Sequence, residues 1–160
     1  MTALGVTGHR SLQDPEPVLQ AIDAALGQVG QDFPAPFRLY SSLAEGADRL
    51  VAWRALDLLG ASLVAVLPME RADYRTDFLD QQSQAEFLAL LARADEVVEL
   101  VPAPSREAAY EAAGRYILDR VDLLFAVWDG QPPRGQGGAG QIVAEAAQRR
   151  VPVVWIRAAT

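Results

Sequence analysis

The sequence contains no cysteine and no lysine, and its 160 residues include a single histidine, His9. Without cysteine, the chain has neither a disulfide framework nor a thiolate site. Without lysine, it cannot supply a P-loop lysine, a Schiff-base amine or a lysine general base. One imidazole leaves too few ligands for a typical zinc site, so we expect no metal site.

Long hydrophobic runs are also missing. No apolar stretch reaches the ~18–20 residues that a transmembrane helix needs. The first residues lack the charged-then-apolar pattern of a signal segment. We therefore expect no membrane partner and a cytoplasmic location.

Positive charge comes only from 14 arginines, against 21 acidic residues, so the net charge is −7. Residues 1–80 carry 6 Arg and 11 acids, and residues 81–160 carry 8 Arg and 10 acids, so neither half is basic. Domains that bind DNA or RNA usually present a basic surface that neutralises several phosphates. The charge therefore disfavours extended nucleic acid as a partner, whereas a small anion held by one or two arginines remains compatible with it.

Strand-like and helix-like segments alternate along the chain. Apolar strand-like runs are expected at 3–7, 37–43, 61–67, 96–101, 121–128 and 151–156. Helical periodicity is expected at 15–30, 45–59, 77–93, 106–117 and 142–147. This alternation predicts one α/β domain spanning residues 1–160, with a doubly wound parallel sheet and helices on both faces.

Three details of this pattern can be checked against the structure. The polar connection 68–76 is longer than a tight turn, which favours a lid or ligand loop, and Tyr74 would then stack on a base. The run 151–156 is expected to be a second buried strand beside 121–128. Trp128 and Trp155 are both expected in the core.

The segment 121–156 is predicted to form a strand, a glycine-rich loop, a helix and a second strand. Its loop follows the carboxyl end of a strand, where open α/β sheets bind ligands. Three glycines would let backbone N–H groups approach an anion, with the positive end of the helix dipole behind them: Gly137, Gly138 and Gly140. The alternative is a surface loop, because the spacing fits neither the Walker A nor the dinucleotide-binding pattern.

Other polar residues follow the ends of predicted strands. After the first strand come Thr7, Gly8, His9 and Arg10. After the second come Ser41, Ser42, Glu45 and Gly46, and after the fifth come Asp129 and Gly130. Each group has a ligand interpretation and a structural one: serines and acids at a helix start cap that helix without any ligand, and glycines form turns.

Four stretches of the chain resemble, in order, the DNA-processing protein DprA (Smf). The main one is Ser41-Ser-Leu-Ala-Glu-Gly-Ala-Asp48, followed by a helix, a glycine and an apolar strand. The others are Thr7–Arg10, Gly114–Asp122 and Gly137–Glu145. The wider group, which includes the LOG-type phosphoribohydrolases, is the SLOG superfamily, so the resemblance implies a Rossmann-like nucleotide-binding domain. It also implies a homodimer.

Departures from these families bear on the chemistry. Where DprA-like proteins often carry Arg for single-stranded DNA, this chain has Glu45. LOG enzymes carry Gly-Gly-x-Gly-Thr-x-x-Glu, whereas here Gln141 replaces the Thr and the acid, Glu145, comes one residue later. A shift of one residue turns a side chain by ~100° around a helix. The resemblance also makes Arg115 a candidate phosphate cation, although it can equally pair with Glu111, one helical turn earlier.

These observations lead to a functional hypothesis with two alternatives. The chain is expected to bind a small nucleotide or nucleotide-derived ligand, such as AMP, ADP-ribose or an NAD-like molecule, with no further cofactor. The first alternative is a LOG-like nucleoside 5′-monophosphate phosphoribohydrolase, in which Glu145 or Glu45 would assist cleavage of the N-glycosidic bond. The second is a DprA-like module for single-stranded DNA, which the acidic charge disfavours.

Overall fold

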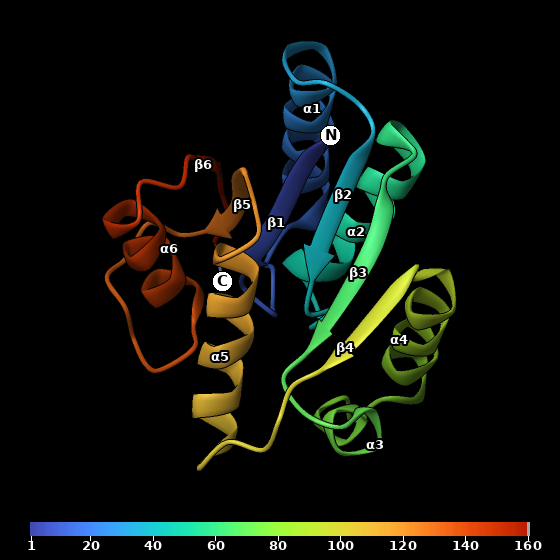
Figure 1. Cartoon of the computed structure of the whole chain (residues 1–160), viewed down its shortest axis with the longest axis vertical. Helices are drawn as coiled ribbons and strands as arrows, with labels where there is room; N and C mark the ends of the chain where they lie inside the picture. Colours follow the sequence, from blue (N-terminus) through green and yellow to red (C-terminus); the bar gives the residue numbers. More distant parts are fainter. Residues whose placement is uncertain (160) are drawn as a thin grey trace.

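The structure, a computed structural model, describes residues 1–159, and it contains one sheet of six parallel strands in the order β4-β3-β2-β1-β5-β6 (Figure 1). The strands are β1 (Thr2–Gly8), β2 (Phe37–Ser41), β3 (Ser62–Leu67), β4 (Glu96–Glu99), β5 (Leu123–Trp128) and β6 (Val153–Arg157). The chain builds the sheet outward from β1 to β4 and then returns to the other side of β1 as β5. The order of the strands therefore reverses between β1 and β5.

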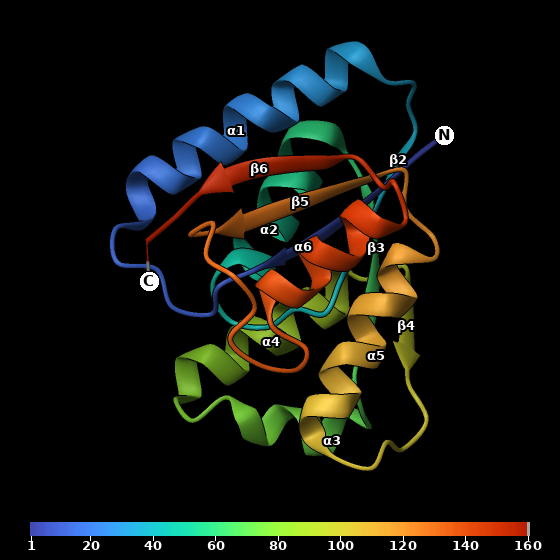
Figure 2. The same cartoon turned by 90° about the vertical axis from the view of Figure 1, so that its left-hand side faces the viewer.

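Helices cover both faces of the sheet. They are α1 (Pro15–Asp32), α2 (Ala47–Leu59), α3 (Arg71–Tyr74), the 3-10 helix η1 (Arg75–Asp77), α4 (Gln81–Arg93), α5 (Arg106–Leu118) and α6 (Ala139–Gln148). Helices α1, α2 and α4 pack in the larger core on one face, and α5 and α6 pack on the other. Figure 2 shows α1 and α6 on opposite sides of β5 and β6. The predicted α/β class, a doubly wound Rossmann-like parallel sheet with helices on both faces, is confirmed. No helix within residues 1–159 is both long enough and apolar enough to cross a membrane.

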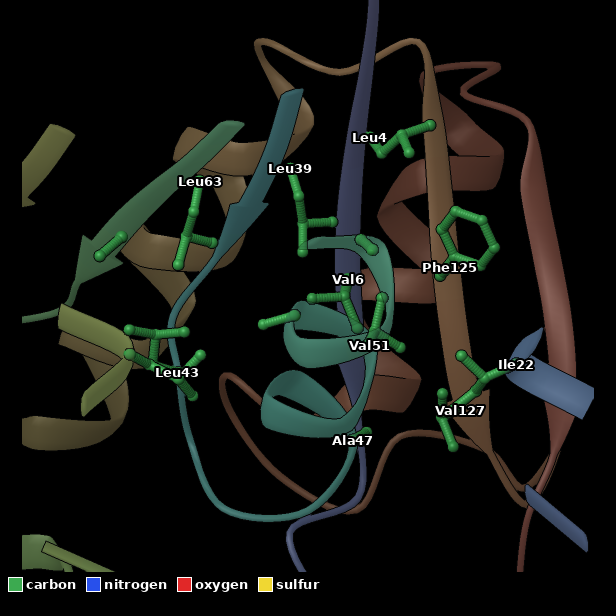
Figure 3. Packing of buried hydrophobic residues seen from close by; sticks show 14 of the residues in the cluster. Leu4, Val6, Ile22, Leu39, Leu43, Ala47, Val51, Leu63, Phe125 and Val127 are labelled. Atoms are coloured by element: carbon green, nitrogen blue, oxygen red, sulfur yellow. The ribbon is translucent and has the colours of Figure 1, made fainter. Parts of the chain in front are cut away.

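Coverage on both faces explains why the strands are apolar almost without interruption. Successive side chains of a strand point to opposite faces, and in a parallel sheet both faces are buried. Phe125 and Val127 therefore pack toward α1 and α2 (Figure 3), whereas Leu124 packs against α5 and α6.

The predicted helix 77–93 is shorter in the structure and is preceded by other elements. The Asp80 carboxylate accepts hydrogen bonds from the N–H groups of Gln82 (2.7 Å) and Ser83 (3.2 Å), so the helix begins after Asp80. The preceding residues form α3 and η1, where the sequence indicated an irregular loop.

Tyr74 lies in the core and not on a mobile lid, so the prediction that it stacks on a base is wrong for this structure. Its side chain is 1% exposed, and its ring makes edge contacts with Phe78 and Phe87 at centroid distances of 5.1 and 5.6 Å. Its hydroxyl donates to the Ser42 carbonyl oxygen at 2.9 Å. Tyr74 thus anchors α3 to the segment that follows β2.

Strand β6 is an edge strand, which corrects the expectation that it is buried. Trp155 is 51% exposed and leans on Trp128, with ring centroids 5.9 Å apart, and its Nε1 donates to the Trp128 carbonyl oxygen. Apolar composition predicts a strand, but it does not report whether another strand will pair on the outer side.

Candidate functional site

The carboxyl ends of β1 and β5 lie side by side at the point where the strand order reverses. Ligands of open α/β sheets bind in the crevice beyond such a point. Three connections meet here: the segment after β1, the segment between β2 and α2, and the glycine-rich loop between β5 and α6 (Figure 2).

The segment after β1 is fixed by close packing and by His9. A Cβ atom on Gly8 would lie 2.4 Å from the Cβ of Ala47 and 2.5 Å from the carbonyl oxygen of Val127, so only glycine fits. The backbone of His9 bonds on both sides, donating to the Val127 oxygen and accepting from the Ala47 N–H, each at 3.0 Å. Its Nε2 accepts from the backbone N–H of Asp129 at 3.0 Å. His9 therefore joins β1, β5 and α2, and in this arrangement Nε2 carries no proton.

Arg10 extends over Tyr110 of α5. Its guanidinium carbon lies 4.8 Å from the centroid of the Tyr110 ring, and its Nη1 lies 3.9 Å from Asp77. Asp77 also accepts from the Tyr110 hydroxyl (2.5 Å) and from Arg106 (2.6 Å). The Arg10 side chain remains 44% exposed, so an incoming anion can reach it.

The segment between β2 and α2 satisfies most of its own polar groups. Ser41 is buried, and its Oγ accepts from the Leu43 N–H and donates to the Asp48 carbonyl oxygen. Gly46 is the N-cap of α2. Ser41 accepts from no N–H group of α2, and the first helical N–H group, that of Ala47, donates to the His9 carbonyl oxygen, so the prediction that Ser41 caps this helix is wrong.

The two acids predicted as catalytic are each engaged by a residue of a neighbouring helix. Glu45 accepts a hydrogen bond from Ser83 Oγ, at 2.5 Å, on the side of α4. Glu145 pairs with Arg115 at 2.7 Å, and Arg115 also pairs with Glu111 at 2.6 Å. The structure thus places Arg115 between two carboxylates of α5 and α6.

The glycine-rich loop closes onto α5 through Gly137 and Gln141. Gly137 has φ +79°, and a Cβ there would lie 2.8 Å from the Cβ of Tyr110, so the loop needs glycine for both reasons. The Gln141 side chain accepts from the Gly137 N–H and donates to Glu111 at 2.5 Å. Gln141 therefore orders the loop, in place of the Thr of the LOG motif.

Helix α6 begins beside a small hollow of about 130 Å³. Gly138 is its N-cap, and the first three helical N–H groups, those of residues 139–141, donate to no acceptor within residues 1–159. Such free N–H groups at a helix start favour an anion. The hollow is bordered by His9, Trp128, Asp129, Pro132, Arg134, Gly135, Gly138, Ala139 and Gly140. Across it, Asp129 is ion-paired with Arg134, and Gly130 turns with φ +83° beneath Trp155.

A second cavity, of about 70 Å³, lies between the sheet and α5. Its polar lining is Thr7, Arg10, Ser42, Asp48, Tyr74 and Tyr110, and its apolar lining includes Val6, Ala113, Ile117, Leu124 and Ile142. At ~10–15 Å³ per water molecule, it has room for about five waters. It can thus admit one nucleobase or a phosphate group, whereas the remainder of a nucleotide would have to lie outside it. Neighbouring residues line the two hollows: Arg10 and Gly137 border the cavity, and His9 and Gly138 border the hollow beside α6.

Asp48 is the acid of this cavity, and the sequence did not single it out as a ligand residue. Burial raises its pKa to about 7, although the Ala44 N–H and the charges of Arg10 and Arg49 act in the opposite direction. In the sequence, an acid in the first turn of a helix looks like an ordinary stabilising charge. Only the packing of α2 under the segment that follows β1 makes it a buried acid.

Comparisons with known proteins give structural matches alone, because no protein-family model and no curated protein matches the sequence. DNA processing protein A (DprA) from Streptococcus pneumoniae is similar, with TM-score 0.65 and 16% identity over 97% of this chain and 50% of that chain. For DNA processing protein A from Helicobacter pylori, a protein described for its single-stranded DNA binding mode, the TM-score is 0.64 and the identity 14%, over 96% of this chain and 64% of that one.

A third similar structure is the Moco carrier protein from Chlamydomonas rheinhardtii, with TM-score 0.53 and 17% identity over 97% of this chain and 75% of that chain. The chain spans between half and two thirds of the length of the two DprA structures. At these identities the likeness concerns the fold. The chain shares a Rossmann-like α/β fold with these proteins.

Proposed function

We propose that the protein binds a small nucleotide or nucleotide-derived ligand, of the AMP, ADP-ribose or NAD type, at the carboxyl ends of β1 and β5. One observation carries the proposal: an open helix start and an exposed arginine lie beside a buried polar cavity at the reversal of the strand order. A phosphate needs donors and positive charge, whereas a base or ribose needs an enclosed surface with a few polar groups.

In this proposal the phosphate lies on the N–H groups that begin α6, and Arg10 supplies positive charge. To bind it, Arg10 would have to weaken its contact with Asp77, which costs little because Asp77 keeps hydrogen bonds from Tyr110 and Arg106. The base or ribose occupies the cavity beside Thr7. The proposal assigns the cation role to Arg10 because Arg115 is already neutralised by two carboxylates.

A thermal-shift screen tests this function. The panel is AMP, GMP, CMP, ADP-ribose, NAD and a short single-stranded oligonucleotide, with products from the same wells separated by chromatography. A ligand at ~100 times its dissociation constant stabilises the fold by about 2.7 kcal/mol. We expect at least one nucleotide to raise the unfolding temperature. The Arg10→Gln variant should bind that nucleotide at least tenfold more weakly.

Arg120→Gln is the matched control, because Arg120 is an exposed arginine beyond the far end of α5 and stacks on Tyr116. This variant should bind like the wild type. A shift produced only by the oligonucleotide and lost steeply with salt would refute the proposal in favour of a DNA-binding module. Release of a free base would instead favour the phosphoribohydrolase alternative.

A further inference from the structure

Asp48 has one carboxyl oxygen without a protein partner, although the residue is only 8% exposed. Its Oδ2 accepts from the Ala44 N–H at 3.2 Å. Within residues 1–159 no donor reaches Oδ1, and Asp48 lines the cavity. Among residues 1–159, Arg49 Nη2 is the fully buried side-chain atom that lacks a partner, and Oδ1 is not another; Oδ1 is therefore open to the cavity, where a ligand group can reach it.

The bond from Ala44 also distinguishes the two oxygens. Since a donor already points at Oδ2, this oxygen must act as an acceptor, and a proton on the carboxyl group belongs on Oδ1. A neutral Asp48 therefore offers the cavity an O–H donor at Oδ1 and a remaining lone pair at Oδ2.

Several charged and titratable groups act on the Asp48 carboxyl group, either by direct charge interaction or by contact with Arg10. They are Arg10, Arg49, Tyr74, Asp77 and Tyr110. The two arginines favour the ionised carboxylate, and burial opposes them strongly enough to raise the pKa of Asp48 to about 7. Both protonation states are thus populated at neutral pH.

We propose that Asp48 is the base-reading residue of the cavity, and that its neutral carboxyl group binds the amidine edge of an adenine or cytosine ring. This inference rests on the proposed nucleotide-binding function. Oδ1–H donates to the ring nitrogen, and Oδ2 accepts from the exocyclic amino group. Ile117, Leu124 and Ile142 line the apolar side of the cavity, where the face of a ring would pack.

The pairing discriminates between bases because the edges differ in their donors. Guanine presents two neighbouring donors, a ring N–H and an amino group, and these suit an ionised carboxylate, which only accepts. Adenine presents one acceptor and one donor, which suit the neutral acid. A base preference that changes with pH is therefore the signature of this contact.

The test is calorimetric titration of the full chain with AMP and with GMP at pH 6, 7 and 8. The two ligands share the same phosphate, so titration of the phosphate near pH ~6 cancels in the ratio of their affinities. We expect AMP to bind more tightly than GMP at pH 6. As Asp48 ionises between pH 6 and pH 8, the affinity for AMP should fall about tenfold and that for GMP should rise about tenfold, so the AMP-to-GMP affinity ratio should fall about a hundredfold. Repeating the titration in buffers of different ionisation enthalpy should show proton uptake with AMP at pH 8.

Asp48→Asn is the decisive variant, because its amide keeps one donor and one acceptor in the same places and does not titrate. It should retain AMP binding and lose the pH dependence of the affinity ratio. Asp48→Ala should lose the preference for AMP. An unchanged pH dependence in Asp48→Asn, a pH-independent ratio in the wild type or a preference for GMP at pH 6 would each overturn the inference and leave nucleotide binding standing. Binding of no nucleotide would overturn the proposed function, and this inference with it.

Discussion

Asp48→Asn should make the ligand-free protein more stable at neutral and alkaline pH. The carboxyl group has a pKa of 3.8 in the unfolded chain and about 7 in the folded protein, chiefly because of burial. Between these values the unfolded chain releases the proton while the folded protein retains it. Rising pH therefore lowers the free energy of unfolding, and this loss of stability is complete above about pH 7. Asparagine, which carries no titrating proton, avoids this loss.

The magnitude follows from the two pKa values. At about 1.4 kcal/mol for each pH unit between 3.8 and about 7, ionisation of Asp48 lowers the free energy of unfolding by about 4 kcal/mol. Because water that enters the cavity would solvate the carboxylate, this is an upper figure. For a chain of this size, each kcal/mol corresponds to about 2–4 °C in the unfolding temperature. The variant should thus unfold several degrees higher at pH 8.

The assay is urea unfolding of wild type and variant from pH 4 to pH 8.5. At each pH, the free energy of unfolding of the wild type is subtracted from that of the variant. Hydrogen bonds from the Gln131 and Arg71 N–H groups lower the pKa values of Asp129 and Glu99, which gives a pH dependence of opposite sign. These contributions occur in both proteins and cancel in the difference. The reasoning would be refuted if the difference in the free energy of unfolding stayed constant with pH, or if the wild type became more stable relative to the variant as pH rises. Either result would show that the arginines outweigh burial.

Two further substitutions test the packing and the electrostatics of the site. Gly8→Ala should lower the free energy of unfolding by about 1–3 kcal/mol in urea, because its Cβ would collide with Ala47. Gly27→Ala, in α1 with open space around it, is the control and should be neutral or slightly stabilising; equal losses in both would contradict the packing argument. Arg115→Gln should leave nucleotide affinity unchanged, because Arg115 is held by Glu145; a tenfold weaker affinity by calorimetry would restore it as the phosphate cation.

Local patterns in the sequence were sufficient for the class of fold. Apolar runs at strand length alternate with helical periodicity, and each connection between parallel strands needs a crossover helix. The same patterns indicate which connections meet at the carboxyl edge of the sheet. They do not report strand order, and for that reason β6 was expected in the interior although it lies at the edge, with Trp155 half exposed.

The residue types near the site were therefore readable from the sequence, but their partners were not. Glu45 and Glu145 carry the right group for acid–base chemistry, yet the packing of α4 and α5 brings Ser83 and Arg115 against them. Asp48 looked like an ordinary helix-start acid, and it became the acid of the cavity because α2 packs beneath the end of β1. Sequence determines which groups a chain offers and on which face of its helix or strand each one lies. Burial and neighbouring charge, which decide what those groups can do, arise only when distant segments pack together.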